Sequence, residues 1–232
     1  MVKIKIFYAA SLFNGRENLF NILLVEKLEE LGYSVFSAQR DGFEFSKLNE
    51  ILKNKLPIDE IDIASSDIIY LLDMGFQLPK CDFVIANMDE PLDSGVDIEQ
   101  TYARLMGKFV IGLRTDVRSP YGSNHDTWGG MHYFPGYQCD ILIKHDMLLN
   151  TGKEAMESIS LLAQKIDIII QENSLKTGRK VSFSNPVIAK AVERAQKLFS
   201  EISDIHSEEG ILEIVKRYSQ NKSYYSVGIV KR

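Results

Sequence analysis

The chain has 232 residues, 45% of them hydrophobic and 25% charged, and a formal net charge of −5 at pH 7. This length fits one domain with an appendage. The acidic balance argues against general binding to nucleic-acid backbones, which needs clustered Lys and Arg side chains. No apolar run reaches the roughly 20 residues of a membrane-spanning helix, so we expect no membrane insertion.

The two cysteines, Cys81 and Cys139, lie far apart and form no C-x-x-C pair. This spacing argues against a zinc site or a disulfide framework and favours a reducing compartment. The N-terminal run MVKIKIFY is too short and too strand-like for a secretory signal. We therefore expect a cytoplasmic protein.

Strand and helix patterns alternate along the first 174 residues. In chain order, they are strand 3–10, helix 16–31, strand 33–38, helix 61–78, strand 83–88, helix 93–106, strand 109–113, strand 141–143 and helix 152–173. Gly32 marks the end of the first helix. The alternation predicts an α/β fold with a parallel central sheet flanked by helices, of the flavodoxin-like or Rossmann-like kind.

The character of the sequence changes after residue 174. Residues 175–182 (LKTGRKVS) have the composition of a linker, and helical patterns follow over 186–202 and 208–218. We therefore expect an α/β domain over residues 1–174 and a C-terminal helical extension over residues 175–232. In open parallel sheets, ligands bind beyond the carboxyl ends of the strands. The segments that follow the expected strands are 11–16, 39–45, 89–99 and 114–128.

The densest group of chemically active side chains is the run DEPLDSGVDIE, residues 89–99, with five carboxylates in eleven residues. Asp93 or Asp97 is expected to cap the helix that begins there. Glu99 would then lie in its first turn, where unpaired N–H groups favour a carboxylate. From composition alone, a solvated loop with a helix cap is the simpler explanation of the run.

The order of several short motifs resembles the nucleoside 2-deoxyribosyltransferase family. These are D-S-G-V-D-I-E-Q-T-Y-A, then G-K-F-V-I-G-L, then T-D-V-R, preceded by an opening strand and loop F-Y-A-A-S-L-F. The family pattern is Asp-x-Gly-x-x-x-Glu, a helix of small residues, Gly-Lys and an apolar strand. The resemblance covers roughly residues 1–170.

The resemblance implies roles for five residues. Glu99 is the nucleophile that forms a glycosyl ester, and Asp73 is the acid that protonates the leaving base. Asp93 holds the sugar and the base edge, and Gln39 contacts the base. Asn124 binds the sugar in a neighbouring protomer's site, which implies at least a homodimer with shared active sites.

Further positions are candidates for substrate contact or depart from the family. Phe13 matches a residue of the base pocket, although an ordinary core position explains it as well. Phe7 stands where the family commonly has a tyrosine that orients the nucleophile. Tyr8 is adjacent, but successive strand residues point to opposite faces. Thr101 replaces a family glycine, and the segment 73–82 is one residue longer than the family pattern.

The chemistry implied is a retaining transfer of 2-deoxyribose between nucleobases, for which two acid groups suffice. We expect no metal and no cofactor. A carboxylate at Asp93 would repel a phosphate, which favours nucleosides over nucleotides. Two alternatives remain open: hydrolysis of a nucleoside or another N-riboside by the same fold, and a nucleoside sensor without catalysis, which Phe7 favours.

A second polar group, His125, Asp126 and His132, has the residue types of a metal site. Three ligands on an irregular loop without a fourth candidate fit zinc geometry poorly. Loop packing or contact with the sugar is the preferred interpretation.

Overall fold

The computed structural model describes residues 3–147, 149–174 and 183–226. The chain divides into two compact units, each built from two segments. Unit 1 comprises residues 1–40 and 80–182, and unit 2 comprises residues 41–79 and 183–232.

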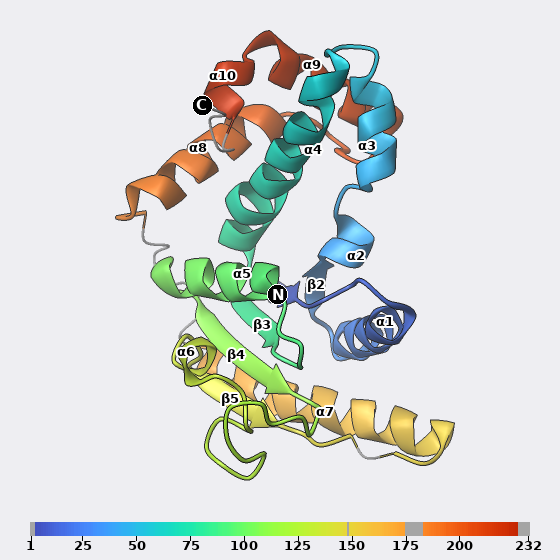
Figure 1. The fold of residues 1–232 in the computed structure, drawn as a ribbon, viewed down its shortest axis with the longest axis vertical. Coiled ribbons are helices and arrows are strands. Elements are labelled where there is room, and N and C mark those ends of the chain that lie inside the picture. Colours follow the sequence, from blue (N-terminus) through green and yellow to red (C-terminus); the bar gives the residue numbers. More distant parts are fainter. Residues whose placement is uncertain (1–2, 148, 175–182, 227–232) are drawn as a thin grey trace. The chain divides into compact units, whose positions relative to one another are not determined.

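Unit 1 is built on a five-stranded parallel sheet with the strand order β2-β1-β3-β4-β5 (Figure 1). The strands are β1 (Lys5–Ala9), β2 (Ser34–Ser37), β3 (Phe83–Asn87), β4 (Phe109–Arg114) and β5 (Ile141–Lys144). All five lie within one or two residues of the expected strands. The predicted α/β fold with a parallel sheet is therefore confirmed.

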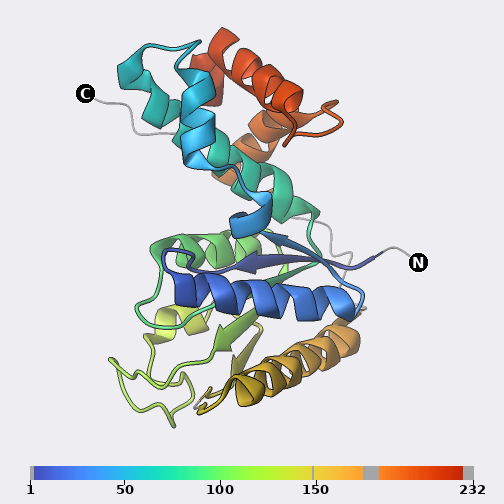
Figure 2. The same ribbon diagram turned by 90° about the vertical axis from the view of Figure 1, so that its right-hand side faces the viewer.

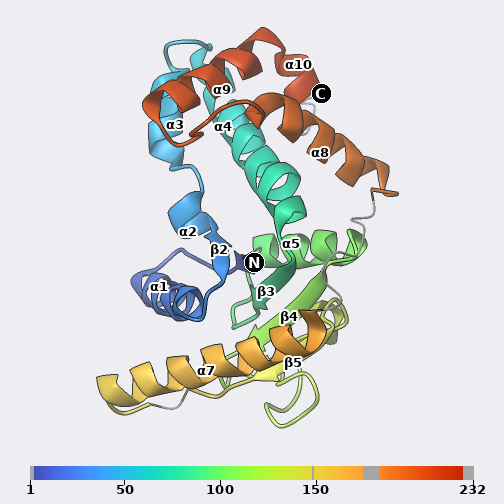
Figure 3. The same cartoon turned by 180° about the vertical axis from the view of Figure 1, so that it is seen from behind.

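Three long helices cover the two faces of this sheet. They are α1 (Gly15–Glu30), α5 (Ser94–Leu105) and α7 (Gly152–Asn173). Helices α1 and α7 run side by side on one face, and α5 lies on the other (Figures 1, 2 and 3). The core between the sheet and helices α1 and α7 contains the buried side chains of Leu24, Leu28, Leu162 and Ile166.

Local sequence explains where α1 begins and ends. The Asn14 side chain accepts hydrogen bonds from the backbone N–H groups of Arg16 and Glu17. Gly32 follows the helix with φ of 100°, a left-handed conformation that favours glycine. The expected stop at Gly32 is thus confirmed.

Unit 2 is helical. Its elements are α3 (Phe45–Leu52), a 3-10 turn η1 (Ile58–Glu60), α4 (Ile61–Tyr70), the π-helical segment η2 (Leu71–Gln77), α8 (Pro186–Phe199), α9 (Glu208–Gln220) and α10 (Lys222–Tyr225). Its core joins the two segments of the unit, since Leu72 and Ile68 share one buried cluster with Leu198 and Ile214. The two C-terminal helices agree with the expected ranges 186–202 and 208–218.

The division of the chain differs from the expected boundary at residue 174. Residues 41–79 cluster with the C-terminal helices rather than with the sheet. We expected no helix or strand over residues 39–57, but this stretch contains α3 and the end of the short helix α2 (Ala38–Asp41). The expected linker 175–182 lies outside the described residues.

Among the residues that the structure describes, no helix is long and apolar enough to cross a membrane.

Candidate functional site

The strand order places a topological switch point between β1 and β3 in unit 1. The chain leaves β1 toward β2 on one side, and later strands are added on the other side. The loops after β1 and β3 therefore run in opposite directions and leave a crevice between them. Open parallel sheets bind ligands in a crevice of this kind. Residues 10–14 and 88–93 form these two loops.

The loop after β3 is anchored to the end of β4 by Asp89. Its carboxylate accepts hydrogen bonds from the backbone N–H groups of Thr115, at 2.6 Å, and Asp116, at 3.1 Å, and from the Thr115 hydroxyl. Burial raises the pKa of Asp89 despite these hydrogen bonds. Asp89 thus ties two loops together at the carboxyl edge of the sheet.

A buried arginine completes this anchor. Arg114 is 1% exposed, donates to the carbonyl oxygen of Met88 at 2.6 Å and forms an ion pair with Asp116 at 3.0 Å. Asp116 also accepts from the backbone N–H of Glu90 at 3.0 Å. Asp89 and Asp116 are both bonded to groups of the loops that follow β3 and β4. We therefore assign these two carboxylates a structural role rather than a reactive one.

Helix α5 begins at one of the two caps that the sequence allowed. Asp93 is the N-cap residue, and its Oδ1 accepts from the backbone N–H of Val96 at 3.1 Å. Gly95 leaves room for this cap, because a Cβ built there would lie 2.8 Å from Asp93 Oδ1. The sequence D-S-G-V therefore fixes the carboxylate of Asp93 at the start of the helix.

Glu99 lies in the second turn of α5, not in the first turn as we expected. Asp93 occupies the cap, so Asp97 is the acidic residue of the first turn. The expectation allowed either aspartate as the cap, and a cap at Asp93 places Glu99 one turn further along the axis. Glu99 is half-buried, three residues after the buried Val96.

The two flanks of α5 carry different acids. At about 100° per residue, Glu99 lies about 60° to one side of Val96, and Asp97 lies about 100° to the other. Gln100, on the Asp97 side, accepts from Cys139, which lies just before β5, and donates to Asp97 at 2.9 Å. Since α5 packs on β3, β4 and β1, the opposite flank, with Glu99, faces β1.

The environment of Asp97 is acidic. Burial raises the pKa of Asp97, and the nearby charges of Asp93 and Glu90 add to the effect, whereas His132 opposes it. Sequence reasoning treated Asp97 only as a possible cap. In the structure, it lies on the β5 side of the helix, away from the switch point.

Phe7 and Tyr8 point to opposite faces of the sheet, as the alternation of strand side chains predicts. Tyr8 belongs to the core beneath α1 and α7. Phe7 is fully buried and stacks on Phe36 of β2, with 5.1 Å between the ring centroids. Phe7 carries no hydroxyl, so it cannot donate a hydrogen bond to Glu99.

A buried polar chain links Tyr8 to Gln39. The Tyr8 hydroxyl donates to Asn21 Oδ1 at 3.0 Å, and Asn21 Nδ2 donates to Gln39 Oε1 at 3.3 Å and to the carbonyl oxygen of Ser11 at 2.9 Å. Burial raises the pKa of Tyr8, and the charge of Asp89 adds to this shift. Asn21 therefore joins two of the expected site residues.

Sequence reasoning missed Asn21, although the sequence carried a signal for it. Asn21 precedes Leu24, Val25 and Leu28 at the spacing of one buried helix face, and it is itself 3% exposed. An amide on such a face must find hydrogen-bond partners inside the protein.

Phe13 and Asn124 lie in loops of unit 1. The Phe13 side chain is 77% exposed, so the core interpretation of this residue is wrong. Asn124 is half-buried, in the loop that follows β4. Asp126 holds this loop in shape by accepting from the backbone N–H groups of Trp128, at 2.8 Å, and Gly130, at 3.1 Å.

Two of the three residues considered for a metal site, Asp126 and His132, have structural roles. His132 is the N-cap of the short helix α6 (Tyr133–Gly136), and its Nδ1 accepts from the backbone N–H of Phe134. Asp126 accepts backbone hydrogen bonds, which lower its pKa. Among the described residues, no three His, Cys, Asp or Glu side chains are grouped to hold a metal ion.

Asp73 belongs to unit 2 and lies in the π-helical segment η2. Its Oδ1 atom is buried and has no hydrogen-bond partner among the described residues. Burial raises the pKa of Asp73 to about 7. Burial therefore favours the protonated form of this carboxyl group far more than in an exposed aspartate, and π-helical segments are frequent at functional sites.

Comparisons with known proteins leave the family open. No family model and no curated protein matches the chain. Similar solved structures include a CMP N-glycosidase from Clostridium botulinum, with 20% identity and a TM-score of 0.36 over 70% of this chain and 98% of that one. A conserved protein from Enterococcus faecalis V583 has 20% identity and a TM-score of 0.42 over 69% and 99% of the two chains. At such low similarity, only the chain's own residues support a function.

Proposed function

We propose that this protein is an enzyme that cleaves the N-glycosidic bond of a 2-deoxynucleoside through Glu99 and transfers the deoxyribose to a second nucleobase. The main support is the position of Glu99: a half-buried carboxylate on the flank of α5 that faces β1, beside the switch point of the sheet. The motif D-S-G-V-D-I-E, which resembles the nucleoside 2-deoxyribosyltransferases, ends on this residue.

The reaction has two displacements. A Glu99 oxygen attacks the anomeric carbon, the bond to the base nitrogen breaks, and the electron pair leaves with the base, which takes up a proton. A second base then attacks the same carbon, loses its proton and releases Glu99. A carboxylate nucleophile divides one difficult substitution into two easier ones and retains the configuration of the sugar.

Asp73 is the acid in this proposal. A group that gives a proton to one base and takes it from the next works best with a pKa near the operating pH. The pKa of about 7 that burial gives Asp73 meets this condition. The assignment of Asp73 rests on its pKa and on its place in the family pattern.

Asp93, Gln39 and Asn124 would bind the substrate. In the proposal, Asp93 holds a sugar hydroxyl, and its negative charge disfavours a 5′-phosphate. Gln39 contacts the base, with its side chain held by Asn21. Asn124 completes the site of a neighbouring copy, so the active form is at least a homodimer. Phe13, Phe7 and Tyr8 are the remaining candidates for substrate contact.

An exchange assay tests the function. The protein is incubated with a deoxynucleoside and a different free base, and the products are separated by chromatography. We expect a new deoxynucleoside, and we expect its rate of formation to fall by at least about 10³-fold in Glu99→Gln, which lacks the nucleophile.

Asp97→Asn is the matched control, because it also neutralises an acid of α5 but on the opposite flank, and it should keep most of the activity. If the assay releases free base but forms no new deoxynucleoside, the enzyme is a hydrolase and not a transferase. No turnover of purine or pyrimidine donors would contradict the proposal and favour a sensor.

A further inference from the structure

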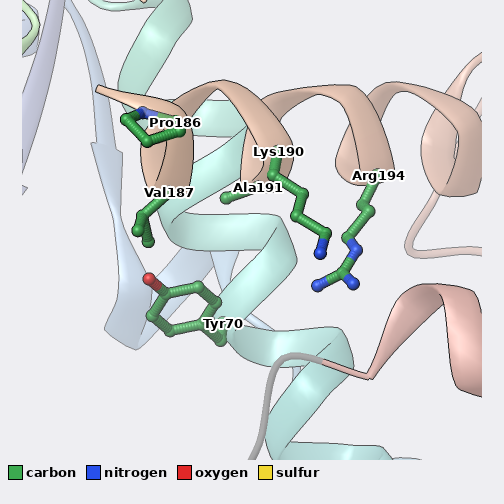
Figure 4. Close-up of a pocket in the computed structure, with 6 residues that line it drawn as sticks. All are labelled: Tyr70, Pro186, Val187, Lys190, Ala191 and Arg194. Atoms are coloured by element: carbon green, nitrogen blue, oxygen red, sulfur yellow. The ribbon is translucent and has the colours of Figure 1, made fainter. Parts of the chain in front are cut away.

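Unit 2 contains a pocket of about 280 Å³ that lies within this unit alone, between the start of α8 and the end of α4. Its lining residues are Tyr70, Pro186, Val187, Lys190, Ala191 and Arg194. The side chains of Lys190 and Arg194 extend in the same direction from α8, and the Tyr70 ring lies across from the start of that helix (Figure 4).

The two cations of this pocket form no ion pair within the described part of the chain. The nearby Glu193 pairs with Lys197, and the charge of Arg194 contributes only as the last cause of the lowered pKa of Glu193. The Arg194 guanidinium lies over the Tyr224 ring, 5.8 Å from its centroid. Like charges four residues apart on a helix repel each other. The buried Nε of Arg194 also has no hydrogen-bond acceptor among the described residues. An anion in the pocket would reduce the repulsion between Lys190 and Arg194 and would give the Arg194 Nε an acceptor.

The rest of the wall is apolar and aromatic. Pro186, Val187 and Ala191 present hydrocarbon surface, and Tyr70 adds a ring. The N-terminal amides of α8 are already used, since Asn185 accepts from the backbone N–H groups of Val187 and Ile188. The anion would therefore bind to the two side chains, and an attached ring would cover the apolar wall.

We propose that this pocket binds a phosphomonoester that carries a planar ring, with the phosphate held by Lys190 and Arg194. Arginine is suited to hold a phosphate through two parallel N–H groups, and lysine adds a point charge. A volume of about 280 Å³ is sufficient for a small ring and a phosphate. The lining residues all belong to unit 2, whereas the acids of α5 belong to unit 1, so this pocket shares no residue with the helix of the proposed nucleophile.

Calorimetric titration of the full-length protein with phenyl phosphate tests the site, because this probe has no N-glycosidic bond to cleave. We expect saturable binding that weakens as salt is added, and an affinity at least about tenfold lower in Arg194→Gln and in Lys190→Gln, a loss of about 1.4 kcal/mol. Arg194→Lys should retain part of the affinity.

The matched control is Lys216→Gln, which removes an exposed cation of α9 that pairs with Glu213 outside the pocket. It should bind phenyl phosphate like the unchanged protein. Binding that is absent, or that is equal in the Arg194→Gln and control proteins, would overturn the site. Equal affinity for inorganic phosphate would overturn the claim that the ligand carries a ring. Thermal melts of each variant establish that it is folded.

Discussion

At the scale of single residues, the Asp73 carboxyl makes stability depend on pH. Burial holds its pKa at about 7, above the usual value for aspartate. Between these two values, the carboxyl of the folded chain stays protonated while that of the unfolded chain ionises. Its favourable contribution to the folded state is therefore fully present below the pKa of the unfolded chain and is lost as the pH rises to about 7.

Asp73→Asn tests this linkage, because asparagine stays neutral at every pH. We expect the unfolding free energy of the unchanged protein, relative to that of the variant, to fall by up to about 4 kcal/mol between pH 4 and pH 8. Urea unfolding at a series of pH values measures this difference. A difference that is flat with pH would show that Asp73 ionises normally.

The hydroxyl of Tyr8 is expected to contribute to stability through Asn21. Tyr8→Phe removes the donor to Asn21 Oδ1 and leaves a buried acceptor without its partner. We expect a loss of about 1–3 kcal/mol in unfolding free energy. The control is Tyr137→Phe at a side chain that is 64% exposed, for which urea unfolding should detect no change. Equal stability of both variants would mean that the buried chain adds nothing.

At the scale of elements, Asp93 has a structural role that can be separated from its proposed role in binding. Asp93→Ala removes the cap of α5 and should cost about 1 kcal/mol of stability. Asp93→Asn keeps an oxygen for the Val96 N–H and should leave stability nearly unchanged. If the carboxylate also holds the sugar, Asp93→Asn should raise KM for the deoxynucleoside. An unchanged KM in Asp93→Asn would leave this residue only its role as a cap.

The elements of unit 1 were predictable because their signals are local. Asn14 and Gly32 mark the limits of α1, and the apolar runs of β3 and β4 mark buried strands. The position of Glu99 relative to the start of α5 was not predictable, because Asp93 and Asp97 are both good caps. Only the backbone geometry distinguishes a first-turn from a second-turn acid.

At the scale of the whole molecule, unit 2 depends on contact between segments that are more than 100 residues apart. Residues 41–79 and 183–232 share one core, and the π-helical segment η2 packs closely on α8. No local sequence pattern predicts such a pairing, because the apolar face of a helix does not indicate which other helix it packs on. The sequence therefore predicted the C-terminal helices but not that residues 41–79 join them.

Gly75 lies where η2 and α8 pack closely against each other. A Cβ built on Gly75 would lie 2.6 Å from the Ala191 carbonyl oxygen and 2.6 Å from the Ala195 Cβ. Gly75→Ala should therefore push η2 and α8 apart and cost about 1–3 kcal/mol. Gly152→Ala is the control, because nothing lies within 4 Å of its added Cβ. Thermal unfolding that is equal for the two variants would contradict the close packing.

The most direct test of the central claim is to find the covalent intermediate. The protein is mixed with a deoxynucleoside, quenched with acid within the first turnover, and digested for peptide mapping by mass spectrometry. The proposed mechanism predicts that the peptide containing Glu99 gains the mass of a deoxyribosyl group, and that Glu99→Gln shows no such adduct while Asp97→Asn does. An adduct on another residue, or turnover of the substrate without any adduct, would contradict the assignment of Glu99 as the nucleophile.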